Sequence, residues 1–158
     1  MYTGFRINEL IYLSTKNINL DKNYLIGGSK TEAGTNRELP EHPKIKSIIK
    51  KYYNEKQEFL FQYSDKPLQY GYINALFYSF RKKYTFLNNH CFHECRHTFR
   101  TELEQLGIKQ VIINAILGHK NGNISLDTYT HITLQEKQMA VNMINYSEEN
   151  KLVVLKTS

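Results

Sequence analysis

The chain has 158 residues with two cysteines and no tryptophan, and it carries a net charge of +6 with a sequence pI of about 9.2. This length favours one domain with a hydrophobic core, and two cysteines four residues apart exclude a disulfide framework and favour a reducing, cytoplasmic setting. No apolar run approaches the roughly 18 residues that span a bilayer, and the N-terminus has no signal-peptide pattern. The basic balance favours an acidic partner, most often nucleic acid, although solubility alone also accounts for it.

The first part of the chain predicts a short helix followed by a small sheet. Apolar residues at helical spacing predict a helix from Arg6 to Leu13, on which Arg6 and Glu9 lie close enough to pair. Three short alternating segments, separated by turn residues, predict an antiparallel sheet: 17–20, 24–26 and 37–39. Lys30 would lie near the second hairpin of this sheet.

The remainder of the chain predicts mostly helices. Five segments have apolar residues at three-and-four spacing: 44–52, 73–83, 92–106, 111–117 and 134–144. Gly107 and Gly118 would end the third and fourth of these helices, and a short helix carrying Tyr129 would follow. Residues 59–67 indicate a brief apolar run and a loop. The fold class is therefore α+β, a mostly helical single domain with one small three-stranded antiparallel sheet near the N-terminus.

The stretch from His90 to Arg100 concentrates imidazole, thiol and guanidinium groups. His93 and Arg96 are three residues apart, so they share a helix face beside the buried stripe and can bind an anion. Zinc needs four ligands, normally from two separated pairs, and a second pair is missing here. Buried free thiols are thus the better interpretation of Cys91 and Cys95, and a zinc-stabilised interaction domain is kept as an alternative.

Basic side chains also stand at the ends of several separate predicted elements: Arg6, Lys30, Arg37, Arg96, His93 and His119. Each one alone is most simply a surface charge. Their combination with the Gly118-His119 pair and with Tyr129, ten residues further on, favours one shared anion site.

In their order these motifs resemble the catalytic domain of the tyrosine recombinases, the phage integrase family. The matching segments are Thr3-Gly4-Phe5-Arg6-Ile7-Asn8-Glu9, Lys30-Thr31 followed by Arg37-Glu38-Leu39-Pro40, His93-Glu94-Cys95-Arg96-His97-Thr98, Leu117-Gly118-His119 and Asp127-Thr128-Tyr129-Thr130-His131. Each motif alone is weakly specific, but five in the family's order are a strong signal. The resemblance implies an integrase-like catalytic core at residues 1–146 and a C-terminal tail at residues 147–158.

The resemblance further implies a site-specific recombinase that cuts and rejoins DNA through a 3′-phosphotyrosyl intermediate. Tyr129 would attack the scissile phosphorus, while Arg6 and Arg96 would hold the non-bridging oxygens in planar, permanently charged forks. No metal and no other cofactor would be needed. The partner would be double-stranded DNA bound by a homotetramer, whereas the chain alone would be monomeric or weakly associated and would not bind a membrane.

Five further residues would assist this reaction if the resemblance holds. His93 would accept or donate a proton near the nucleophile, Lys30 would protonate the leaving 5′-oxygen, and His119 would hydrogen-bond the phosphate. Glu9 would orient Arg6, and His97 would be a packed support within the site.

The chain departs from the family pattern at its start, because family members precede the first motif with further helices and a separate DNA-clamping domain. We therefore expect weak DNA binding, slow or undetectable cleavage, and apolar surface near residues 7–13 that is either exposed or covered by a neighbour. Two alternatives stay open: a DNA-binding fragment without catalysis, and a strand-passage enzyme like the type IB topoisomerases.

Overall fold

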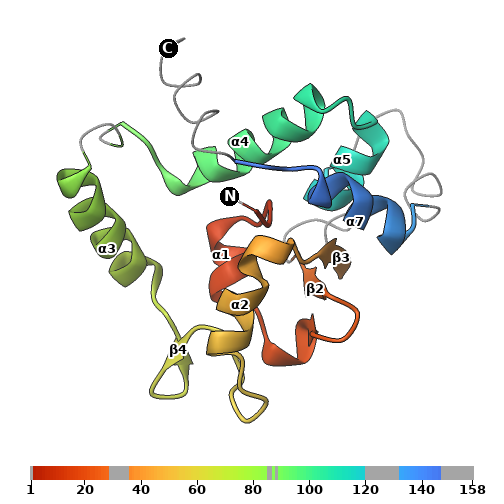
Figure 1. Cartoon of the computed structure of the whole chain (residues 1–158). Coiled ribbons are helices and arrows are strands. Elements are labelled where there is room, and N and C mark those ends of the chain that lie inside the picture. The colour runs from red at the N-terminus through yellow and green to blue at the C-terminus, as the bar shows by residue number, and fades with distance from the viewer. Residues whose placement is uncertain (1, 29–35, 85–86, 88, 120–131, 147–158) are drawn as a thin grey trace.

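The computed structural model describes residues 2–28, 36–84, 87, 89–119 and 132–146 (Figure 1). The predicted features at Lys30 and Tyr129, and the tail at 147–158, lie outside these residues. The described helices are α1 Ile7–Ile11, α2 Pro43–Tyr52, α3 Tyr70–Lys83, α4 Phe92–Gln105, α5 Gln110–Leu117 and α7 Leu134–Asn142, with a 3-10 turn η1 at Thr15–Asn17. The described strands are β1 Ile18–Asn19, β2 Tyr24–Gly27, β3 Arg37–Pro40, β4 Gln62–Tyr63 and β5 Lys66–Pro67.

The predicted three-stranded antiparallel sheet is confirmed, with the strand order β1-β2-β3. Leu25 in the middle strand pairs with Ile18 on one side and with Leu39 on the other. Because directly opposed residues project from the same face of a sheet, these three apolar side chains form one row, and all three are buried. This row gives the sheet its core-facing side.

One hydrophobic core joins the sheet to three helices. Phe99 and Leu103 of α4 and Ile113 of α5 are fully buried in it, and Val141 of α7 is 1% exposed. Both α5 and α7 lie against β3. The core therefore fixes the first residues of β3 close to the C-terminal end of α5, where the candidate site is found.

The apolar surface predicted at residues 7–13 is not exposed in this structure. Ile11 and Leu13 are each 2% exposed, and only Tyr12 of the large apolar residues in this segment faces solvent. The exposed apolar surface lies instead on α3, which Figure 1 shows to one side of the other helices. None of the fourteen residues of α3 is buried.

Two other predictions need correction. On α2, Ile49 is buried, but Ile48 and Tyr52 of the same predicted stripe are about half exposed. Residues 62–67, predicted as a loop, form the two-stranded hairpin of β4 and β5. Within the described residues, no helix is both long and apolar enough to cross a membrane.

Candidate active site

The carboxylate of Glu9, whose side chain is 3% exposed, lies at the centre of the candidate site. Arg6, the residue just before α1, donates from Nη1 to Oε1 at 2.9 Å and from its backbone N–H to Oε2 at 2.9 Å. Arg37 donates from Nη1 to Oε1 at 3.2 Å and from Nη2 to Oε2 at 2.7 Å. Desolvation favours a higher pKa for Glu9, but the bonds and charge of Arg37, followed by the bonds of Arg6, hold this pKa below its usual value. The predicted pairing of Arg6 with Glu9 is thus present, and the carboxylate is ionised.

Arg96 is held by main-chain oxygens. Its Nη1 donates to the carbonyl oxygen of Gly4 and its Nη2 to that of Leu117, both at 2.5 Å. Nη1 also lies 4.0 Å from Oε2 of Glu9, so Arg6 and Arg96 meet at one carboxylate. Burial, together with the charges of Arg6 and Arg37, lowers the pKa of Arg96 to about 10, so the guanidinium stays a cation at neutral pH.

Gly4 and Gly118 bring these carbonyl groups within reach of Arg96. Gly4 has a φ of 62°, and a side-chain carbon added there would lie 2.8 Å from the ring of Phe99. Gly118 adopts the left-handed conformation that ends α5, with its N–H bonded to the carbonyl oxygen of Asn114 at 2.7 Å. Both positions therefore favour glycine for a physical reason.

The C-terminal end of α5 is capped by two arginines. The last carbonyls of a helix have no partner inside the helix and carry partial negative charge. Arg37 Nε donates to the carbonyl oxygen of Ile116 at 2.9 Å, and Arg96 donates to that of Leu117. The helix end thus aligns two guanidinium groups that come from a strand and from another helix.

Sequence reasoning listed Arg37 among the residues of a shared anion site but gave it no task in the reaction, and it missed a signal for the burial of this side chain. Arg37 and Leu39 are two residues apart on β3, so they project from the same face of the strand. Both are buried, whereas Glu38 between them is half-buried. An arginine in register with a core leucine has to find a buried acceptor, and its acceptors in the described part of the chain include Glu9 and the end of α5.

His119 is a neutral imidazole that bonds Arg96. Its Nε2 lies 3.0 Å from Nη2 of Arg96. Because a guanidinium only donates, Nε2 is the acceptor and the ring proton resides on Nδ1. Burial first, and then the charge of Arg96, lowers the pKa of His119 to about 4. At neutral pH the ring can therefore donate one hydrogen bond from Nδ1 to an incoming anion.

A cleft of about 250 Å³ opens beside the arginines, and its lining includes Arg6, Glu9, His93 and Arg96. The structure thus brings the predicted proton-transfer residue to the two predicted phosphate-binding residues. His97 differs from its prediction as a packed support, because it is exposed. Its ring instead meets the ring of His93 edge-on, with a centroid distance of 4.6 Å.

The charges gathered here suit a phosphate group. Among the described residues, three guanidinium cations gather around one carboxylate and one neutral imidazole, so this cluster carries a net charge of +2. A phosphodiester carries one negative charge, and more charge accumulates on its oxygens in the transition state of a displacement at phosphorus. Fixed cations stabilise that charge without having to reorganise.

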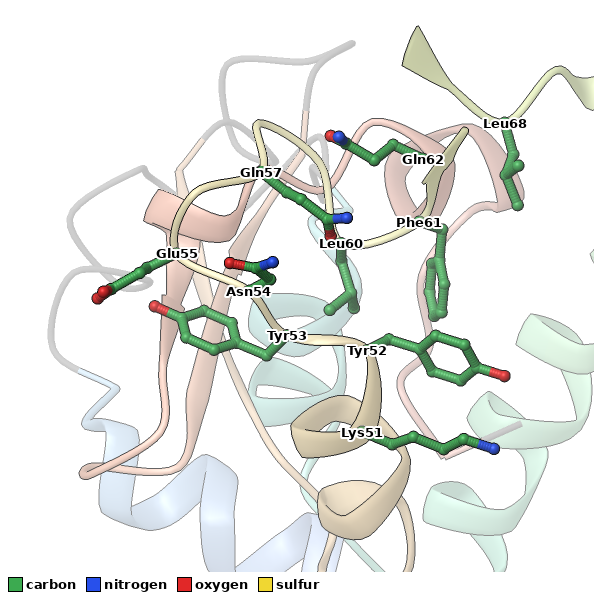
Figure 2. A pocket seen from close by; sticks show the side chains of 10 residues that line it. All are labelled: Lys51, Tyr52, Tyr53, Asn54, Glu55, Gln57, Leu60, Phe61, Gln62 and Leu68. Carbon is green, nitrogen blue, oxygen red and sulfur yellow. The ribbon is translucent and has the colours of Figure 1, made fainter. Parts of the chain in front are cut away.

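A larger hollow of about 660 Å³ lies between the end of α2 and the β4–β5 hairpin (Figure 2). Tyr52 and Phe61 face one another in it, with ring centroids 5.4 Å apart. Amide and aromatic side chains dominate the lining, and among the described residues that line it Lys51 is the one cation. We place the candidate site at the smaller cleft because that cleft holds the converging arginines.

The cysteines are not in the environment that the sequence predicted. Cys91 precedes α4 and is exposed, and Cys95 is half-buried, so the interpretation of both as buried core thiols is wrong for Cys91. Across the part of the chain that the structure describes, no three His, Cys, Asp or Glu side chains gather closely enough to hold a metal ion.

This small α+β domain collects two buried arginines and a neutral histidine at one helix end, an arrangement whose charge and N–H donors suit a phosphate-like anion. The family model described as "Phage integrase family" matches residues 1–136 of this chain. The chain therefore belongs to the phage integrase family. The α+β class and the small antiparallel sheet that the sequence predicted are both confirmed.

Two relatives are similar over most of the chain. A protein named tyrosine recombinase from Thermosipho africanus is 27% identical over 90% of this chain and 50% of its own length. A protein named tyrosine recombinase XerA from Pyrococcus furiosus is 28% identical over 92% of this chain and 52% of its own length. The chain thus spans about half the length of these relatives.

Solved structures share the fold. The integrase of the Tn1549 transposon, determined in complex with circular intermediate DNA, has a TM-score of 0.60 at 23% identity, over 90% of this chain and 54% of that one. The integrase from mycobacterium phage Brujita has a TM-score of 0.66 at 15% identity, over 99% of this chain and 54% of that one.

Proposed function

We propose that this chain is the catalytic part of a site-specific DNA recombinase, which cuts and rejoins strands through a 3′-phosphotyrosyl intermediate. The observation that carries the proposal is the convergence of Arg6 and Arg96 on one buried carboxylate, with His119 bonded to Arg96. Family membership supports the same reaction. Residues 1–146 would form the catalytic domain, and residues 147–158 its tail.

In this proposal the arginines bind the scissile phosphate. Arg6 is the more accessible of the two, with a side chain that is 28% exposed, and it lines the cleft. Arg96 is buried, and its charge acts from the floor of the cleft while its main-chain bonds keep it in place. His119 adds a neutral N–H donor to the phosphate oxygens, and none of these groups has to move as charge develops.

Three further residues complete the proposed reaction. Tyr129 attacks phosphorus with its phenol oxygen, and the bond to the 5′-oxygen breaks. His93, at the cleft, accepts or passes on the phenolic proton. Lys30 supplies a proton to the leaving 5′-oxygen. No metal or other cofactor takes part, since the phosphotyrosyl bond stores the energy for rejoining by another strand's 5′-hydroxyl group.

Double-stranded DNA is the proposed partner, bound by a homotetramer in the cytoplasm. The chain carries a net charge of +6, and the last turn of α3 contributes Arg81, Lys82 and Lys83 with no acidic residue in that helix. Phosphate contacts by such residues make affinity salt-dependent, with a slope of about −0.9 per contact on a log–log plot. The chain alone is expected to be monomeric or weakly associated.

The test is covalent trapping on a nicked DNA duplex that bears the recombination site, because loss of a short strand prevents rejoining. Because a trapped adduct accumulates even when cleavage is too slow to follow by turnover, the wild-type chain should form a protein–DNA adduct over long incubation. Tyr129→Phe should form none, because it lacks the attacking oxygen. Tyr63→Phe is the matched control, since Tyr63 is 79% exposed on β4, outside the cleft. If Tyr129→Phe still forms the adduct, Tyr129 is not the nucleophile.

A DNA-binding fragment without catalysis is the second candidate, because the chain spans about half the length of its relatives. Salt-dependent DNA binding without any adduct would favour it. Relaxation of supercoiled DNA by a monomer, without assembly on paired sites, would instead favour a strand-passage enzyme.

A further inference from the structure

Arg37 connects three elements around the cleft through one buried side chain. It begins β3, its side chain is 4% exposed, and its Nη atoms bind both oxygens of Glu9. Its Nε bonds the carbonyl oxygen of Ile116 in α5. Figure 1 shows α1, β3 and α5 as separate elements, so this guanidinium connects the carboxylate to the end of α5 more closely than Arg96 does, whose Nη1 lies 4.0 Å from Glu9.

The orientation of Arg6 depends on that carboxylate. Nη1 of Arg6 bonds Oε1 of Glu9, the same oxygen that Nη1 of Arg37 bonds. A long side chain that reaches into a cleft keeps one conformation only if its acceptor is itself fixed. The backbone N–H of Arg6 holds one oxygen of Glu9. Arg37 fixes the plane of the carboxylate because it presents two parallel donors in a planar fork, which a single-point cation cannot do.

We propose that Arg37 is a positioning residue of the cleavage site: by binding both oxygens of Glu9 it orients the guanidinium of Arg6 for the phosphate. This inference rests on the proposed function, in which Arg6 binds the scissile phosphodiester. Arg37 lies behind Glu9 and does not line the cleft, so it acts on the substrate through Glu9 and Arg6.

The charge of Arg37 has a second consequence for Glu9. Among the groups that hold the pKa of Glu9 down against desolvation, Arg37 is the largest. Without it, the pKa of Glu9 rises, and a protonated carboxyl group loses an acceptor for Arg6 as pH falls. Loss of Arg37 therefore makes the orientation of Arg6 pH-dependent, which a purely structural role does not predict.

The first experiment needs no DNA. Side-chain NMR follows the Glu9 carboxyl carbon and the Arg6 Nε–H signal across a pH titration of the wild type, Arg37→Met and Arg37→Lys. In Arg37→Met we expect Glu9 to titrate at higher pH than in the wild type, and the Arg6 signal to weaken over the same pH range. Arg37→Lys should keep Glu9 ionised by its charge but still broaden the Arg6 signal, because the fork is lost.

The second experiment measures single-turnover cleavage of the nicked duplex at saturating DNA. We expect Arg37→Met to lower the cleavage rate about 100-fold while DNA affinity changes less than about 3-fold, and the loss to shrink as pH rises. Arg37→Lys should lose about 10-fold without the pH dependence. Arg100→Met is the matched control, because Arg100 pairs with Glu104 on the exposed side of α4.

The outcomes separate this inference from the proposed function. Arg37 is not a positioning residue if a folded Arg37→Met variant keeps the wild-type titration of Glu9 and the wild-type Arg6 signal. The same conclusion holds if the variant changes the Glu9 titration and the Arg6 signal but leaves the cleavage rate unchanged. If the wild type itself forms no adduct, the proposed function fails, and NMR still decides whether Arg37 orients Arg6. If Arg37→Met does not fold, the NMR titration and the cleavage measurement are made on Arg37→Lys. An Arg6 signal in Arg37→Lys that is as sharp as in the wild type would overturn the inference.

Discussion

The arginine cluster and helix α3 differ in which side chains they bury and which they expose. In the cluster, the charged groups of Glu9, Arg37 and Arg96 are buried and bonded to one another or to main-chain carbonyls. On α3, every aromatic side chain except the half-buried Phe77 is exposed, and cations lie over some of the rings, as Lys82 does over Tyr78 at 4.7 Å. Charge is inside in one region, and apolar surface is outside in the other.

This contrast predicts that the two regions contribute very differently to the stability of the domain. A buried cation that loses its partner keeps the desolvation penalty and loses the compensating attraction, so each member of the cluster depends on the others. Within the described residues, α3 contacts the remainder through Phe77, whose ring lies tilted against that of Phe92 with centroids 4.4 Å apart, and through a 2.7 Å hydrogen bond from Arg81 to the carbonyl oxygen of His90. Stability should therefore be concentrated in the cluster and almost absent from α3.

The largest effect is expected from Glu9→Ala. This change leaves Arg37 and Arg96 buried without their carboxylate and should reduce the free energy of unfolding by about 3–5 kcal/mol. Urea denaturation measures the loss, with Glu104→Ala as control, because the exposed pair of Glu104 with Arg100 should contribute less than about 1 kcal/mol. Equal losses in the two variants would show that the cluster does not act as a unit.

Glu41→Gln should raise stability at neutral pH by about 1 kcal/mol. Glu41 is 2% exposed, neither side-chain oxygen has a hydrogen-bond partner within the described ranges, and burial raises its pKa above 4.5. The folded state then favours the protonated acid, so stability is present below pH 4.5 and is lost as pH rises through the raised value. Thermal unfolding should show that Glu41→Gln is more stable than the wild type at pH 7 but not at pH 4. A gain in stability at both pH values would show that the buried charge of Glu41 is not its cause.

His119 should make stability fall in mild acid. Its folded pKa of about 4 lies below the ordinary value of 6.5, so the unfolded chain binds the proton first. Stability is fully present above pH 6.5 and is lost as pH falls toward 4. After allowance for partial exposure, the wild type should lose about 1 kcal/mol more than His119→Gln between pH 7 and pH 5. His90→Gln is the control, since His90 is exposed and pairs with Glu94; the same response in both variants would contradict the assignment.

The smallest effect is expected on α3. Tyr72 and Leu76 are 57% and 53% exposed, so Tyr72→Ser and Leu76→Ser should each change the free energy of unfolding by less than about 0.5 kcal/mol. Thermal unfolding measures the change, and Phe99→Ala in the core is the reference for a large loss. A loss above 1–2 kcal/mol on α3, on the order of a core effect, would mean that this helix packs on the domain in solution.

The regular elements were predictable because their patterns are local. The alternation around Leu25 and Leu39 and the helical spacing of Phe99 and Leu103 each follow from a few neighbouring residues. The convergence of Arg6, Arg96 and His119 was predicted through resemblance, and no local pattern could have supplied it. The roles of these residues, and of Lys30 and Tyr129, stay predictions.

The missed features depend on distant or unusual partners. Arg37 bonds Glu9 across 28 positions and Ile116 across 79, so its burial shows only as register with Leu39. The β4–β5 hairpin turns through Ser64 and Asp65, which both have positive φ, where asparagine and glycine are the usual signal. The exposure of α3 has no local signature, because its apolar spacing is that of an ordinary amphipathic helix.

The main-chain bonds of Arg96 have a consequence for redesign. Every residue type has the same carbonyl oxygen. A substitution near the cleft that preserves the path of the backbone therefore keeps the hydrogen bonds of Arg96 to these oxygens. Inserting or deleting a single residue next to Gly4 or Leu117 would shift those oxygens and unseat it. Apart from Glu9, Arg37 and the two glycines, variants of this domain should therefore tolerate exchange of side chains around Arg96 but almost no change in loop length.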